Sequence, residues 1–105
     1  MPYQEAIEAL ADPTRRAIFE NLKAGPSSVA EIAGSQPVSR PAVSQHLKIL
    51  HSAGLVAARQ DGTRRYYSIR REGLSELRNW VEGFWSEVLE SYAAQVRSQV
   101  GEYDD

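Results

Sequence analysis

Apolar positions that recur every three to four residues predict helices along most of the chain. Four helices are expected in the first half, over residues 3–11, 13–23, 29–33 and 39–53. Capping residues mark three of the starts: Asp12 precedes Pro13, Ser28 precedes the third helix, and Ser39 precedes a first turn that contains Pro41. Gly54 ends the fourth helix, because glycine readily adopts the left-handed backbone found after a helix.

The period then changes from helical to alternating. Leu55–Gln60 and Arg64–Ile69 are typical of two strands, and Asp61-Gly62 between them predicts a hairpin. A helical pattern returns over residues 72–100, and the tail 101–105 is expected to fray. The predicted fold class is therefore mainly α with a small β-hairpin (α+β), in the order α-α-α-α-β-β-α. The 105 residues fit a single domain, 1–105.

Composition excludes several classes of function. The chain has no cysteine, which removes disulfides and thiolate metal sites. Its longest apolar run is four residues, and its first residues contain no secretory signal, so no membrane partner and a cytoplasmic location are expected. It also lacks a glycine-rich phosphate loop, a paired-carboxylate site and a nucleophile–base motif. We therefore expect neither an enzyme nor a bound cofactor.

Charge is distributed unevenly along the chain. The net charge is −2, but residues 39–71 carry seven Lys/Arg and one acid, a local charge of +6. Residues 72–105 carry two basic and eight acidic residues, a local charge of −6. This asymmetry is typical of a polyanion-binding face on an otherwise acidic protein, although chance clustering on a solvated surface would look the same.

The fourth predicted helix has one apolar face and one face suited to DNA. The second face gathers short polar, amide and cationic side chains: Ser39, Arg40, Ser44, Gln45, Lys48 and His51. Such groups hydrogen-bond to base edges or neutralise phosphates. No Asp or Glu occurs between Ser39 and Gln60, whereas an ordinary surface helix mixes both signs. His46 falls on the apolar side and is expected to be structural, with a hydrogen bond inside the domain.

The predicted hairpin adds a second basic element. Arg59, Thr63, Arg64 and Arg65 surround its tip and could follow the DNA backbone or enter the minor groove. The alternative role for these arginines is to protect an exposed strand edge from pairing with another chain. A protein–protein module that binds an acidic partner is the alternative function, and the acid-free stretch favours DNA over it.

The last predicted helix, 72–100, carries an apolar arc wider than one core face needs. We predict that it forms a homodimer together with the first helix, 3–11; the alternative is that it wraps its own domain. The expected interface residues are Ile7, Leu77, Trp80, Val81, Phe84, Trp85, Val88 and Tyr92. A two-fold dimer would present its two DNA-reading helices to an inverted repeat in double-stranded DNA.

Three segments resemble the ArsR/SmtB family of bacterial winged-helix repressors. Leu10–Ile18 is similar to the start of that family's second helix. Val38–Val56 is similar to its recognition helix and exit, and Arg59–Ile69 to its wing. The resemblance implies a winged helix-turn-helix fold and a homodimeric repressor that an effector releases from its operator.

The chain departs from the metal-sensing members of that family. Those members hold their ion with a cysteine pair on the third helix, or with His and acidic residues on the terminal helices. Here the third helix, 29–33, has no cysteine and the last helix has no histidine, so no metal site is expected. The effector, the operator and the choice between repressor and activator stay open at this point.

Overall fold

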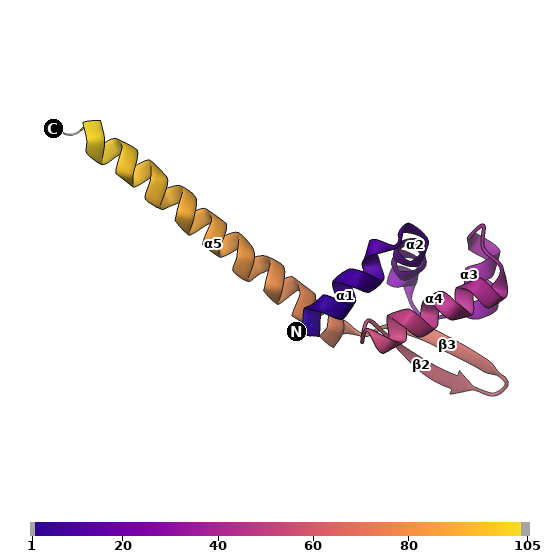
Figure 1. Cartoon of the computed structure of the whole chain (residues 1–105). Coiled ribbons are helices and arrows are strands. Elements are labelled where there is room, and N and C mark those ends of the chain that lie inside the picture. Colours follow the sequence, from indigo (N-terminus) through magenta and orange to yellow (C-terminus); the bar gives the residue numbers. More distant parts are fainter. Residues whose placement is uncertain (1, 104–105) are drawn as a thin grey trace.

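The computed structural model of the chain describes residues 2–103 (Figure 1). Its elements are α1 (Pro2–Ala11), α2 (Pro13–Asn21), the 3-10 helix η1 (Leu22–Ala24), β1 (Ser27–Ser28), α3 (Val29–Ser35), α4 (Arg40–Ser52), β2 (Val56–Asp61), β3 (Arg64–Ile69) and α5 (Arg71–Tyr103). The predicted class, mostly helical with a small antiparallel sheet, is confirmed.

Side-chain caps start three of the helices where the sequence predicts them. The Asp12 carboxylate accepts a hydrogen bond from the Arg15 backbone N–H at 2.9 Å, which lowers the pKa of Asp12 below its ordinary value. Ser28 and Glu31 form a reciprocal capping box at α3. The Ser39 hydroxyl accepts from the Ala42 N–H at 3.3 Å and caps α4. These bonds satisfy backbone donors that each helix start leaves unpaired.

The sheet differs from the predicted hairpin by one strand. β1 pairs antiparallel with β3, so the strand order is β1-β3-β2. Two residues are too few to show the alternation that predicts a strand. The turn is also shifted by one residue, since Asp61 pairs with Arg64 and leaves Gly62 and Thr63 at the tip. Gly62 has φ +64°, which suits the first central position of a two-residue hairpin turn.

The core lies between the helices and one face of the sheet. It consists of buried apolar side chains from every element except β1 and α5, together with Leu55 from the loop before β2: Ala6, Ala9, Ile18, Phe19, Leu22, Ile32, Val43, Leu47, Leu50, Leu55, Val56 and Tyr67. Because α4 contributes three of them along one face, its opposite face is held outward. We call residues 2–69 with this core the body.

Helix α5 leaves the body as a single rod (Figure 1). It is longer than predicted, at 33 residues, and spans about 50 Å at 1.5 Å per residue. Residues 101–103 continue the helix, so fraying there is wrong, and residues 104–105 lie outside the described part. Near its start α5 packs on α1, where the Tyr3 and Trp80 rings stack 5.2 Å apart. Within residues 2–103 no helix is long and apolar enough to cross a membrane.

Candidate nucleic-acid interface

The predicted DNA-reading face of α4 points to solvent. Ser39, Arg40, Ser44, Gln45, Lys48 and His51 are all exposed, as are Arg59, Thr63, Arg64 and Arg65 on the hairpin. The opposite side of α4 is anchored by three fully buried residues, Val43, Leu47 and Leu50. The helical period thus holds the polar side chains away from the core on a rigid support.

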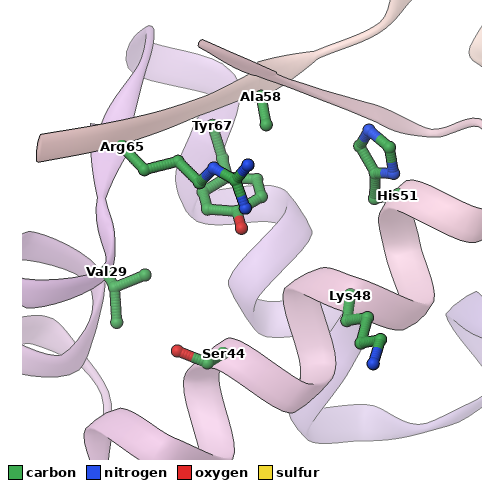
Figure 2. Close-up of a pocket in the computed structure, with 7 residues that line it drawn as sticks. All are labelled: Val29, Ser44, Lys48, His51, Ala58, Arg65 and Tyr67. Atoms are coloured by element: carbon green, nitrogen blue, oxygen red, sulfur yellow. The ribbon is translucent and has the colours of Figure 1, made fainter. Parts of the chain in front are cut away.

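A cavity of about 490 Å³ separates α4 from the hairpin (Figure 2). Ser44, Lys48 and His51 come to it from α4, and Arg65 and Tyr67 come from β3. Val29 and Ala58 complete its wall. This groove between α4 and the hairpin therefore has basic and hydroxyl groups on both sides. Such groups are the ones that contact the phosphates of a nucleic-acid strand.

A second hollow, of about 340 Å³, adjoins the start of α4. Arg40, Arg64 and Arg65 line it together with the first residues of α3. The fold therefore brings the arginine at the start of α4 next to the hairpin arginines, which stand 24 and 25 positions later in the chain. Ser39, Gln45, Arg59 and Thr63 line neither hollow and lie on the surface around them.

The cations of this surface have no acidic partners among the side chains that the structure describes, those of residues 3–100. The ion pair found there within 4.0 Å joins Arg78 and Glu82 on α5, away from α4 and the hairpin. Asp61 is the one acid between residues 39 and 71. Positive charge at the surface is thus left for an external anion, which is the electrostatic requirement for phosphate contacts.

His46 differs from its prediction. It is half-buried on the inner side of α4, but its buried Nδ1 has no hydrogen-bond partner among the described residues. The hydrogen bond inside the domain that the sequence predicts for His46 is therefore not formed at this atom. Among the described side chains of residues 3–100, no group of three or more His, Cys, Asp or Glu could hold a metal ion.

Tyr67 is the site residue that the sequence analysis missed. It is 8% exposed, belongs to the core and also lines the groove between α4 and the hairpin. Residues two apart on a strand share one face, so Tyr67 lies on the same face of β3 as Arg65. That alternation was available in the sequence, but the presence of α4 opposite this face was not.

Comparison with known proteins identifies the family. Residues 12–58, from the cap of α2 into β2, match the model of bacterial regulatory proteins of the arsR family. HTH-type transcriptional regulator Rv2034 of Mycobacterium tuberculosis is 52% identical over 94 residues, which cover 90% of this chain and 88% of that protein. The chain belongs to the ArsR family. It is a transcriptional regulator and not an enzyme, as predicted.

Two further matches support the regulatory class and the fold. Transcriptional repressor SdpR of Bacillus subtilis is 36% identical over 78 residues, covering 74% of this chain and 87% of that protein. The homodimeric winged helix-turn-helix DNA-binding domain of Mb0332 from Mycobacterium bovis superposes with a TM-score of 0.67 at 34% identity. That match covers 86% of this chain and 83% of the other. The predicted winged helix-turn-helix fold is confirmed.

Proposed function

We propose that this ArsR-family regulator is a homodimeric repressor that binds an inverted repeat in double-stranded DNA. The observation that carries the proposal is the exposed, acid-free face of α4 beside the basic hairpin. We further propose a cytoplasmic location, since the operator DNA of a bacterial regulator lies there.

The DNA contacts are divided between α4 and the hairpin. Ser44 and Gln45, in the first half of α4, read base edges in the major groove. Arg40 and Lys48 hold phosphates or guanine. The Ser39 hydroxyl, which caps α4 as an acceptor, donates a hydrogen bond to a phosphate oxygen. His51 contacts the backbone of the same strand, where it crosses the groove between α4 and the hairpin.

The hairpin reaches a neighbouring part of the duplex. Arg59, Thr63, Arg64 and Arg65 are exposed on β2, the turn and β3. Arginine is favoured in the minor groove, where the electrostatic potential is most negative. The two elements together explain why positive charge is concentrated in residues 39–71.

The dimer rests on the apolar surface of α5, with Ile7 from α1 at its margin. Large apolar side chains stay exposed along the rod, including Trp80, Val81, Phe84, Trp85, Val88 and Tyr92. Leu77 is half-buried near the contact with α1. The molecule measures 75 × 25 × 23 Å with a radius of gyration of 19.9 Å, against about 13 Å for a compact chain of 100 residues. A second copy would cover this surface, which is larger than monomers usually expose.

Repression and the homodimer are supported by the relatives. The Bacillus subtilis protein is named a transcriptional repressor, and the Mycobacterium bovis domain is described as homodimeric. In such a dimer the two α4 helices would face half-sites about one helical turn apart.

Selection from a random duplex pool tests the function. The wild-type protein should enrich an inverted repeat, sediment as a dimer at micromolar concentration, and lower transcription from a promoter that contains the selected site. Enrichment of no sequence over non-specific binding, or a monomer at that concentration, would contradict the proposal.

A further inference from the structure

The first turn of α5 is packed against Gly54, which lies two residues past the end of α4. Gly73 is buried, and a Cβ atom placed on it would collide with the carbonyl oxygen of Gly54 and lie 2.9 Å from the Gly54 carbonyl carbon. That neighbour is backbone, so it cannot rotate away as a flexible side chain would. Glycine is the residue that allows this approach.

Hydrogen bonds hold the same contact from both sides. The Arg70 N–H donates to the Leu55 carbonyl at 2.9 Å, and the Arg70 guanidinium donates to the Gly54 carbonyl at 3.3 Å. On the other side, the Gly54 N–H donates to His51 and the Leu55 N–H donates to Leu50, each at 3.0 Å. Gly54 and Leu55 are therefore hydrogen-bonded both to the last turn of α4 and to Arg70 at the start of α5.

Gly83, in the same helix, shows that this constraint is local. It is exposed, and a Cβ atom placed on it would have nothing within 4 Å. The two glycines share a helix and a residue type but differ in what lies beside them. Only Gly73 has a neighbour that forbids a side chain.

We propose that this contact, the Gly54–Gly73 joint, sets the angle between α4 and α5 and thereby the spacing of half-sites that the dimer accepts. The inference rests on the proposed homodimer and names its positioning residues, Gly73 and Arg70. α5 carries the dimer surface and α4 the DNA-reading face, so a rotation at the joint moves α4 relative to the two-fold axis. Because the dimer contains two joints, the change in distance between the α4 helices is doubled.

The test measures binding to a single half-site and to inverted repeats whose spacing varies one base pair at a time. Wild type, Gly73→Ala and the control Gly83→Ala are compared by fluorescence anisotropy, with dimerisation followed by sedimentation. Gly73→Ala should keep its single half-site affinity within about twofold and lose at least tenfold on the repeat that wild type prefers. It should also move or broaden the preferred spacing. Gly83→Ala should keep the wild-type profile.

If Gly73→Ala forms a folded dimer with the wild-type spacing profile, the proposal that the joint sets the spacing is wrong. If Gly73→Ala does not fold, the spacing profile of Arg70→Ala tests the proposal instead. Arg71→Ala is the control, because it removes the same charge from the next residue. A spacing profile broader for Arg70→Ala than for Arg71→Ala supports the joint, and identical profiles overturn it. Failure of the wild type to prefer any spacing would instead refute the proposed function.

Discussion

The body and α5 use their apolar residues in opposite ways. In the body, the large apolar side chains of α2, α3 and α4 meet in one core, and eight of the larger core side chains are less than 2% exposed. On α5, Phe84 is 57% exposed, Trp85 59% and Tyr92 66%. Burial of apolar area is the main force that stabilises folded proteins and their assemblies. The body is therefore stabilised by burial within one chain, whereas α5 leaves apolar surface that this chain alone does not cover.

Placing a charge on the apolar face of α5 should have the largest effect, a loss of dimerisation. In Phe84→Glu, a carboxylate would lie on the proposed dimer face of α5, and burying an unpaired charge is costly. We expect the Kd of the dimer to rise at least about a hundredfold, equivalent to about 2.8 kcal/mol, with a parallel loss of operator affinity. Analytical ultracentrifugation and anisotropy measure the two effects.

Glu90→Ala is the matched control, since Glu90 lies on the polar side of α5 and should leave the dimer intact. Circular dichroism should show that Phe84→Glu keeps a folded body. An unaltered dimer in Phe84→Glu would remove this face of α5 from the interface.

A change on the DNA-reading face should act on α4 without touching α5. Gln45→Ala removes an amide that is exposed in the first half of α4. We expect a loss of about 1–3 kcal/mol on the preferred site and relaxed preference at one position per half-site. Lys48→Ala is the comparison, because loss of a phosphate contact should weaken all sequences alike. Equal effects on specific and random duplexes in both variants would exclude base reading by Gln45.

A change in the body should alter stability without altering assembly. The Ser28 hydroxyl, in a residue 4% exposed, accepts from the Glu31 N–H at 3.2 Å. Ser28→Ala should lower the free energy of unfolding by about 1 kcal/mol, measured by urea denaturation at fixed protein concentration. Ser27→Ala is the control, since that hydroxyl makes no hydrogen bond to the described residues 3–100. A weaker dimer in Ser28→Ala would mean that body and rod are coupled more tightly than their separate burial suggests.

The hairpin arginines should contribute through phosphate neutralisation. Replacing Arg64 and Arg65 together with Ala should flatten the slope of log affinity against log salt by about one to two units, near 0.9 per lost contact. Titrations of random duplex from low to high salt measure it. An unchanged slope would assign these arginines to protection of the strand edge.

Metal should have the smallest effect. No cysteine occurs in the chain, and both histidines lie on α4, where His51 faces outward and His46 inward. We expect Zn²⁺, arsenite and chelator to leave operator affinity within the error of the measurement. A stoichiometric metal that shifts affinity more than tenfold, about 1.4 kcal/mol of coupling, would contradict this prediction.

Local chemistry made most elements predictable. Asp12, Ser28 and Ser39 cap the helices whose starts they predict, because an N-cap depends on contacts within four residues. The outward face of α4 followed from its period, since three buried residues on one side orient all the others. β1 was missed because its two residues form a strand only against Tyr66 and Tyr67.

The sequence alone therefore specified the helices, the strands of the hairpin, the polarity of α4 and the apolar arc of α5, all of which depend on short-range order. It left out relations between distant segments: the groove that joins Lys48 to Arg65, the dual role of Tyr67, and the contact of Gly73 with Gly54. A glycine in a helix looks the same in sequence whether its neighbour is solvent, as at Gly83, or a backbone carbonyl, as at Gly73. The physical reason is that packing between elements is set by three-dimensional proximity, which the local periodicity of a chain does not encode.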